Sequence, residues 1–263
     1  MSDALLRRTQ LESELRQALL RGEFEVRYQP ILDVASGVVV GAEALLRWQH
    51  PLRGLIGPES FVPLCESTGL IRPLGLWVFT EAARQQVRWA RAGTCLRVSV
   101  NLSVQQLRQA DLLPALVAAI EATGADPRLL QLEITESMLL GRDPAVLEQL
   151  RGIEAAGMSI ALDDFGTGYS NLGYLQRFPI RILKIDKSFI QCLDSNRPLA
   201  ELIVAMCRLM SLSVVAEGVE SAEQLDWVRA QGIEQCQGFL FAPPLSAEAF
   251  TEFLHAPRAQ GAL

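Results

Sequence analysis

Ser159-Ile-Ala-Leu-Asp-Asp-Phe-Gly-Thr-Gly168 is the stretch from which the fold and the chemistry of this chain follow most directly. It begins as a buried strand that ends in two adjacent carboxylates, Asp163 and Asp164, and a glycine-rich turn comes next. Two neighbouring acids at a strand end repel each other and lose hydration unless a cation or a partner compensates them. Because Gly166 and Gly168 let a backbone approach a ligand closely, the pair indicates a hard cation such as Mg²⁺ or Mn²⁺. A capped turn with two solvated acids is the alternative that this stretch alone leaves open.

The composition of the whole chain narrows the class of protein. Its 263 residues, 49% of them hydrophobic, are typical of a single α/β barrel with a sizeable core. The net charge of −6 argues against a protein that grips DNA through a basic face. It allows a small phosphate ligand where metal ions reverse the local field. The two histidines lie far apart, which argues against a histidine-rich zinc site.

Cysteine usage and the N-terminal segment predict a cytoplasmic protein. The five cysteines form no CxxC pair and are odd in number, so they read as small buried residues in a reducing compartment. No uncharged apolar run approaches the roughly 18 residues of a membrane span. Charges are spread along the first twenty residues, so this segment is not a signal peptide. We therefore expect no membrane attachment.

The order of the expected elements predicts the fold class. An amphipathic helix is expected over residues 5–20, ended by Gly22, followed by a hairpin of two strands over 24–32 and 38–47 and a loop over 51–57. Helices then alternate with short strands. The expected helices are 59–67, 74–92, 104–109, 112–123, 144–156, 199–210, 222–230 and 247–254. The expected strands are 96–101, 129–134, 158–163, 181–186, 213–217 and 234–237. This α/β pattern predicts a (β/α)₈ TIM-like barrel with an antiparallel first strand. We expect residues 1–263 to form one domain, with the helix at about 1–22 as part of it.

The predicted strands all end in polar residues, and in such barrels the active site forms at the carboxyl ends of the strands. These residues are Glu43, Asn101, Glu133, Asp163 with Asp164, Lys184 with Asp186, Glu217 and Gln237. Strand alternation places Lys184 and Asp186 on one face and their apolar neighbours on the other, so the polar face can line the barrel mouth.

Each of these residues also has a structural explanation when it is taken singly. Asn101 or Asp186 could cap a helix, Lys184 could reach the surface, and Glu43 or Glu217 could be solvated strand ends. The weaker interpretation is that all of these structural explanations hold at once in a chain of this topology. An all-oxygen set instead fits two divalent cations about 3.5–4 Å apart, bridged by Asp163. Such sites catalyse in-line displacement at phosphorus, so the residues predict phosphoester hydrolysis.

The sequence also resembles the EAL domain family, whose signature here is Glu43-Ala-Leu45. The matching segments are Tyr28-Gln-Pro30, Glu43-Ala-Leu-Leu-Arg-Trp48, Asn101-Leu-Ser103, Glu133-Ile-Thr-Glu136, Asp163-Asp-Phe-Gly-Thr-Gly-Tyr-Ser170, Leu183-Lys-Ile-Asp186, Ala216-Glu-Gly-Val-Glu220 and Gln237-Gly-Phe239. They stand in the family's order and cover the chain from about Leu11 to the last helix. The resemblance implies a phosphodiesterase of bacterial second-messenger signalling. It would hydrolyse cyclic di-GMP to linear 5′-pGpG by in-line attack of a metal-bound water, with two Mg²⁺ or Mn²⁺ ions per active site.

The resemblance also implies a role for each matching residue. The first metal would be held by Glu43, Asn101, Glu133 and Asp163, and the second by Asp163, Asp164 and Glu217. The implied catalytic residues are Lys184, Glu217 and Glu220. Lys184 would orient the attacking water or share its proton, and Glu220 would fix metal ligands or waters. Gln29, Arg47 and Gln237 would contact the substrate, Arg47 through a planar fork that suits phosphate. Glu136 would hold the glycine-rich loop.

The remaining implications concern partners and the rival function. The resemblance implies a homodimer formed near Asn171, with sensory or GGDEF domains outside this chain. Asn171 stands where a serine is usual and Phe239 where tyrosine is frequent, and neither belongs to the metal set. The alternative is a non-catalytic cyclic di-GMP receptor or protein-interaction module of the same fold. Such relatives usually lack one of the metal-binding acids or the lysine, and this chain retains them all.

Overall fold

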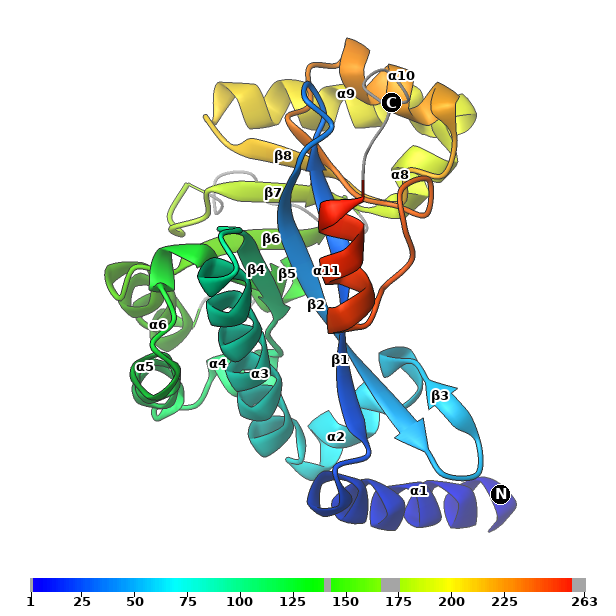
Figure 1. Ribbon diagram of the computed structural model, residues 1–263, viewed down its shortest axis with the longest axis vertical. Helices are drawn as coiled ribbons and strands as arrows, with labels where there is room; N and C mark the ends of the chain where they lie inside the picture. The colour runs from blue at the N-terminus through cyan, green and yellow to red at the C-terminus, as the bar shows by residue number, and fades with distance from the viewer. Residues whose placement is uncertain (1, 140–142, 167–175, 257–263) are drawn as a thin grey trace.

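The computed structural model of the chain describes residues 2–139, 143–166 and 176–256, with side chains from residue 10 onward (Figure 1). Within these residues the strands form one sheet, and eight of them close into a barrel in the order β1-β9-β8-β7-β6-β5-β4-β2. They are β1 (Phe24–Asp33), β2 (Val39–His50), β4 (Arg97–Asn101), β5 (Leu130–Thr135), β6 (Ser159–Phe165), β7 (Ile182–Ile185), β8 (Ser213–Ala216) and β9 (Gln235–Cys236).

The direction of β1 distinguishes this barrel from an all-parallel one. β1 runs antiparallel to both of its neighbours, β2 and β9, and the other neighbouring barrel strands pair in parallel. β1 and β2 pair over nearly their whole length, as the turn between them predicts. The predicted (β/α)₈ TIM-like barrel with an antiparallel first strand is confirmed.

The helices cover the outside of the barrel, and α11 lies along β1 (Figure 1). Their bounds are α1 (Ser2–Arg21), α2 (Val62–Thr68), α3 (Ile71–Arg91), α4 (Val104–Leu107), α5 (Leu112–Thr123), α6 (Pro144–Ala155), α8 (Lys187–Gln191), α9 (Leu193–Leu209), α10 (Ala222–Ala230) and α11 (Ala247–His255). Short 3₁₀ turns occur at η1 (Pro58–Ser60), η2 (Pro127–Leu129) and η3 (Glu136–Leu139). Among the described helices, none combines the length and the apolar run that a bilayer crossing requires.

Three local predictions were wrong or incomplete. The loop expected at 51–57 contains β3 (Gly54–Ile56), which pairs with the end of β2. The helix expected at 59–67 is split into η1 and α2, because Phe61 leaves the helical region with φ −130°. The helix expected from residue 199 begins at Leu193, since α9 accommodates Pro198 in its second turn, and α8 was not predicted.

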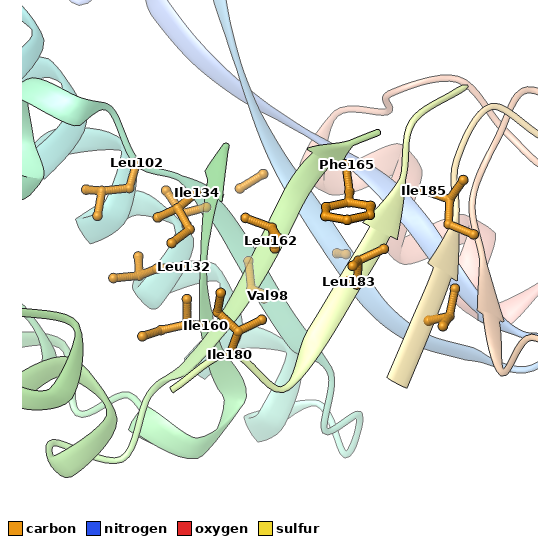
Figure 2. Close-up of a cluster of buried hydrophobic side chains, with 14 of the residues drawn as sticks. Val98, Leu102, Leu132, Ile134, Ile160, Leu162, Phe165, Ile180, Leu183 and Ile185 are labelled. Carbon is orange, nitrogen blue, oxygen red and sulfur yellow. The ribbon is translucent and has the colours of Figure 1, made fainter. Parts of the chain in front are cut away.

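Strand alternation separates the apolar and polar faces of the barrel wall. In β5, Leu132 and Ile134 join the main hydrophobic core between the strands and the outer helices. Figure 2 shows such side chains from β4 to β7 on the side of the sheet that the helices cover. Glu133, between these two residues, therefore faces the barrel interior.

A second hydrophobic cluster lies at the α1 end of the molecule. It combines side chains from α1, the first residues of β1, the end of β2, α2 and the first turn of α3. We call it the aromatic cluster, because Phe24, Trp48 and Phe61 pack there with ring centroids 5.8–5.9 Å apart. Leu15 and Ala18 of α1 are buried in it, as the amphipathic pattern predicts, and α1 ends at Arg21 before Gly22.

Candidate active site

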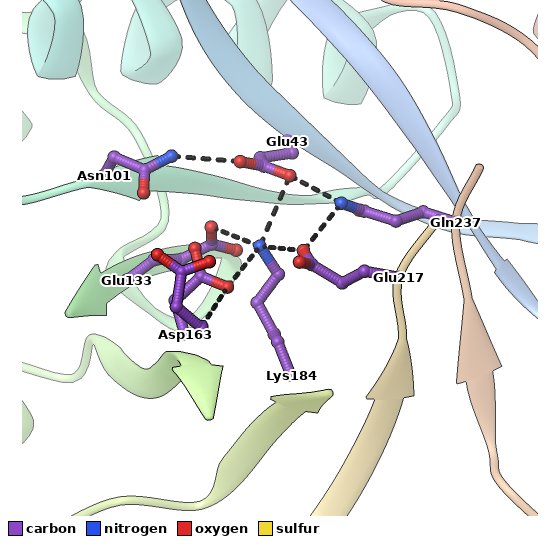
Figure 3. A network of polar contacts seen from close by, with 8 residues as sticks. Glu43, Asn101, Glu133, Asp163, Lys184, Glu217 and Gln237 are labelled. Carbon is purple, nitrogen blue, oxygen red and sulfur yellow. Dashed lines mark hydrogen bonds and ion pairs between the residues drawn. The ribbon is translucent and has the colours of Figure 1, made fainter. Parts of the chain in front are cut away.

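Polar side chains from seven barrel strands or from the residues directly after them meet at the carboxyl ends of the parallel strands. They are Glu43 on β2, Asn101 on β4, Glu133 on β5, Asp163 and Asp164 on β6, Lys184 on β7, Glu217 after β8 and Gln237 after β9. In-register pairing aligns Asn101 with Glu133 on neighbouring strands. Figure 3 labels all of these except Asp164 and shows the labelled side chains pointing toward one another.

Lys184 stands at the centre of the site. Its Nζ lies 2.7 Å from Glu133 Oε2 and from Glu217 Oε1, and 3.3 Å from Glu43 Oε2 and from Asp163 Oδ1. The lysine side chain is 1% exposed, so water does not solvate the ammonium. Within the described residues one cation thus faces four carboxylates, and the buried negative charge exceeds the positive charge.

Two amides fix the orientation of the carboxylates. Gln237 Nε2 donates to Glu43 Oε2 at 2.7 Å and to Glu217 Oε1 at 3.0 Å. Asn101 Nδ2 donates to Glu43 Oε1 at 2.9 Å, which leaves the amide carbonyl as the atom that can ligate a cation. Asn101 does not cap the helix that follows; Ser103 caps α4 through the N–H of Gln106.

Asp163 and Asp164 reach the same site because the backbone departs from a regular strand. Alternation would direct two successive side chains to opposite faces. Asp164 instead has φ 54°, in the left-handed region that non-glycine residues seldom adopt, and the β6–β7 register shifts between Leu162 and Phe165. The Asp164 N–H donates to Asp163 Oδ1 at 3.0 Å, which stabilises this turn.

The carboxylates fall into two groups that share Asp163. Ligand atoms of Glu43, Glu133 and Asp163 lie within 4.8 Å of one another, and so do those of Asp163, Asp164 and Glu217. Both groups offer only oxygen, the donor that Mg²⁺ and Mn²⁺ prefer, and four of the five carboxylates contact Lys184. These oxygens fit divalent cations, and the two groups contain the carboxylates of the ligand sets that the resemblance implies.

Burial and mutual repulsion make the carboxylates of the protein alone hard to ionise. Burial, and next the nearby Glu43, raise the pKa of Glu133 from 4.5 to about 8. The pKa values of Asp163, Asp164 and Glu217 also rise, chiefly through burial. Glu43 is the exception. Burial alone would raise its pKa, but Lys184 and the two amides hold it below its ordinary value.

The pKa of Lys184 responds to the same charges. Burial alone would lower it, but the surrounding carboxylates, Asp163 foremost, hold it well above its ordinary value. Cations bound beside the lysine would disfavour its charged form. In the protein alone, the ammonium is the group that compensates the carboxylates.

Comparisons with known proteins agree with this geometry. The sequence profile described as the EAL domain matches residues 12–244. This chain belongs to the EAL domain family.

Some of the proteins that are similar to this chain are named as enzymes. NbdA of Pseudomonas aeruginosa, a cyclic di-GMP phosphodiesterase, is 42% identical over 253 residues, which are 95% of this chain and 32% of NbdA. PdeR of Escherichia coli, also named a cyclic di-GMP phosphodiesterase, is 40% identical over 243 residues, or 91% of this chain and 37% of PdeR. The PaMucR phosphodiesterase in its c-di-GMP complex has a TM-score of 0.89 at 42% identity, covering 92% of this chain and 99% of that one. The chain spans about a third of the length of the curated relatives that it matches.

Glu136 contacts the turn after Asp164, and its role in holding the glycine-rich loop stays a prediction. The Gly166 N–H donates to Glu136 Oε2 at 3.3 Å. Gly166 has φ +98°, and a Cβ on it would lie 2.7 Å from the Phe189 ring, so this turn requires glycine. Residues 167–175, which include Gly168 and Asn171, lie outside the described part of the chain.

The residues that the resemblance implies for substrate contact, Gln29 and Arg47, lie on β1 and β2 beside the carboxylates. Gln29 is buried beside Glu43 in the β1–β2 register, and its Nε2 donates to the Ala242 carbonyl at 3.2 Å. Arg47 lies on the same face of β2 as Glu43, with Nη1 donating to the Leu46 carbonyl at 2.8 Å.

Glu220 lies outside the two carboxylate groups. Its Oε1 accepts from Gln191 Nε2 at 2.8 Å. Sequence reasoning missed Gln191 and the Ala242 carbonyl, because neither contact has a spacing signal. Gln191 is 29 residues before Glu220, and Ala242 is 213 residues after Gln29.

Proposed function

We propose that this EAL domain hydrolyses cyclic di-GMP to linear 5′-pGpG with two divalent cations, Mg²⁺ or Mn²⁺. The observation that carries the proposal is the pair of carboxylate groups sharing Asp163 around a buried lysine at the barrel mouth. Two relatives at 40–42% identity are named as phosphodiesterases of this dinucleotide, and a similar solved structure is a c-di-GMP complex.

Glu43, Glu133 and Asp163, with the carbonyl of Asn101, would hold one cation, and Asp163, Asp164 and Glu217 would hold the other. Bound cations would activate water for attack and neutralise charge that develops on the phosphate. The protein's own contribution is to fix these oxygens before the substrate arrives. Gln237 and Asn101 do so by donating to Glu43, and Gln237 also donates to Glu217.

In this reaction Lys184 would carry a proton or orient the attacking water. Its ammonium is buried between the two carboxylate groups, with contacts to members of both. From there it can orient the attacking water or share its proton. Gln29 pairs with Glu43 across β1 and β2, and Arg47 follows Glu43 on β2; both would contact the substrate. Glu220 would fix metal ligands or waters.

A non-catalytic receptor of cyclic di-GMP is the rival function. Receptors with this fold would not need the complete set of acids, whereas here none of the implied ligands is missing. Buried carboxylates in such excess reduce stability unless cations compensate them, so their presence favours the enzyme. Homodimerisation, domains outside the chain, a cytoplasmic location and the one-domain assignment of residues 1–263 stay predictions.

The decisive experiment incubates the purified chain with cyclic di-GMP in Mg²⁺, in Mn²⁺ and in EDTA, and resolves the nucleotides by chromatography. We expect 5′-pGpG to appear only with metal. An Asp163→Asn variant, which removes the charge shared by the two groups, serves as the matched inactive control. Bound but intact nucleotide in the presence of either metal would support the receptor instead. If the chain neither bound nor hydrolysed the nucleotide, both functions would be refuted.

A further inference from the structure

The barrel interior directly beneath the carboxylates contains both apolar and polar side chains. Barrel interiors of this type are normally filled with bulky branched side chains. Ile31, Ala161, Ile182 and Val215 form such an apolar cluster here. Beside it, Arg97, Ser99, Gln131 and Gln235 occupy inward-facing positions on β4, β5 and β9.

These polar residues, together with Ile31, Gly41 and Val215, line a small space that reaches the active site. The cavity has room of about 10 Å³ for the centre of a water molecule, close to the minimum that one water requires. Glu133 and Lys184 form its upper wall, and Ser99 lies on the strand next to Glu133. The cavity thus touches the metal-binding set from the side opposite the barrel mouth.

Two lining atoms lack a hydrogen-bond partner within the described residues. They are Ser99 Oγ and Glu133 Oε1, and both are fully buried. Ser99 is 1% exposed, and so is Glu133. Buried hydroxyl and carboxylate oxygens are nearly always paired in folded proteins, by protein groups or by ordered water. A hydroxyl can donate to a water, and that water can donate to a carboxylate.

We propose that this cavity holds one ordered water, which accepts from Ser99 Oγ and donates to Glu133 Oε1. Glu133 Oε2 is 2.7 Å from Lys184 Nζ, so the water would fix the second oxygen of the same carboxylate. Ser99 is then a positioning residue, because it sets the direction in which Glu133 presents its charge to a cation.

Arg97 supports the same interpretation. It lines the cavity, and its Nη1 donates to Gln131 Oε1 at 3.3 Å, while no carboxylate within the described residues lies within ion-pairing distance of it. Burial lowers the pKa of Arg97, and the charge of Glu133 acts in the opposite sense. A water between these groups transmits that attraction through hydrogen bonds in a space too small for a larger ligand.

The positioning role rests on the proposed metal site, whereas the water itself does not. The test compares the whole chain with Ser99→Ala and with Ser159→Ala. Ser159 is the matched control, since its Oγ lies 3.5 Å from Gln131 Oε1 but does not line the cavity. The first readout is a crystal structure that resolves single waters, and the second is Mg²⁺ affinity measured by calorimetry without nucleotide.

We expect a water between Ser99 Oγ and Glu133 Oε1 in the wild-type protein. Ser99→Ala should weaken Mg²⁺ binding about tenfold, as removal of groups that orient metal ligands does, while Ser159→Ala leaves it unchanged. A dry cavity, or wild-type Mg²⁺ affinity in Ser99→Ala, would overturn the inference. A wild-type protein that holds the water but binds no Mg²⁺ would instead refute the proposed metal site and, with it, the role of Ser99.

Discussion

β2 contributes to two regions that use burial in opposite ways. At the barrel mouth it places Glu43, 5% exposed, among four other carboxylates and a lysine. Five residues later it places Trp48, 0% exposed, in the aromatic cluster against Phe24 and Phe61. Burial of the indole removes apolar surface from water and stabilises the fold, while burial of the carboxylate costs desolvation energy.

The difference shows that the groups at the barrel mouth reduce the stability of the fold, whereas those in the aromatic cluster increase it. In the aromatic cluster each side chain has partners that suit it, and the one polar atom of Trp48 donates to Glu23 Oε2 at 3.0 Å. At the mouth, the carboxylates exceed the single compensating ammonium. Changes at the mouth should therefore alter activity and metal dependence, and changes in the aromatic cluster should alter stability alone.

The largest effect is expected from Glu43→Ala. The variant removes a carboxylate of the first group and the acceptor of both amides, so the turnover of cyclic di-GMP should fall about 10⁴-fold, or about 5 kcal/mol of barrier. Mg²⁺ affinity, measured by calorimetry, should fall with it. Glu121→Ala, an exposed change on α5, is the control. Wild-type turnover of Glu43→Ala under saturating Mg²⁺ would remove Glu43 from the metal set.

Lys184→Met should separate the rate from substrate binding. The long apolar side chain keeps the volume but removes the ammonium, so kcat should fall by about 10²–10³ while KM stays within threefold, since general acid–base groups contribute about this much. In EDTA the variant should lose about 4 kcal/mol of unfolding free energy, because the carboxylates lose their compensating charge. Mg²⁺ should restore most of that stability.

The control for the lysine is Lys187→Met, three residues further along on the exposed side of α8. It should change neither kcat nor the urea midpoint. If Lys184→Met raised KM as strongly as it lowered kcat, the lysine would be a substrate-binding group. If it left metal-free stability unchanged, the account of buried charge at the mouth would be wrong.

Phe61→Ala tests the other region. Phe61 is 0% exposed and contacts both Phe24 and Trp48, so its truncation should cost about 3 kcal/mol of unfolding free energy through lost burial and a cavity. Well below the melting temperature, kcat and Mg²⁺ affinity should stay at wild-type values. Phe239→Ala is a matched change at a ring that is 64% exposed, and should alter stability by about 0.5 kcal/mol or less. A loss of Mg²⁺ affinity in Phe61→Ala would show that the two regions are coupled.

Much of the fold follows from local pattern. Helix α10 (Ala222–Ala230) begins and ends at the predicted residues, because Ser221 and Gln224 form a capping box at its start. In β5 the alternation of Leu132, Glu133 and Ile134 predicts both the strand and the face that bears the acid. Such signals are contained in a few consecutive residues, and the closed barrel then brings the strand ends together.

The parts that could not be predicted depend on distant contacts or on backbone conformation. The left-handed φ of Asp164 is unusual for aspartate, and only the shifted β6–β7 register shows why both acids reach one site. β3 is three residues long, and its pairing with the end of β2 has no pattern of its own. Ser99 resembles any small strand residue until the cavity beside it is known.

The smallest effect we expect is a pH dependence of stability that belongs to the mouth alone. The pKa of Glu133 rises from 4.5 to about 8 on folding, and those of Asp163, Asp164 and Glu217 rise as well, while that of Glu43 falls. Between these pH values the folded protein holds protons that the unfolded chain releases, so stability falls as the pH rises. Glu43 titrates in the opposite sense but below about pH 4.5, outside this range, so we expect stability to fall between about pH 5 and pH 8 in EDTA.

Urea denaturation across this pH range, in EDTA and in saturating Mg²⁺, measures the effect. Cations bind the deprotonated carboxylates, so with Mg²⁺ the trend should reverse and stability should rise with pH. Glu133→Gln should flatten the metal-free profile, because the amide cannot ionise, whereas Phe61→Ala should lower the whole profile and leave its slope unchanged. A wild-type protein in EDTA that gained stability from pH 5 to pH 8 would mean that Lys184 compensates the carboxylates fully, and that burial at the mouth costs no more than burial in the aromatic cluster.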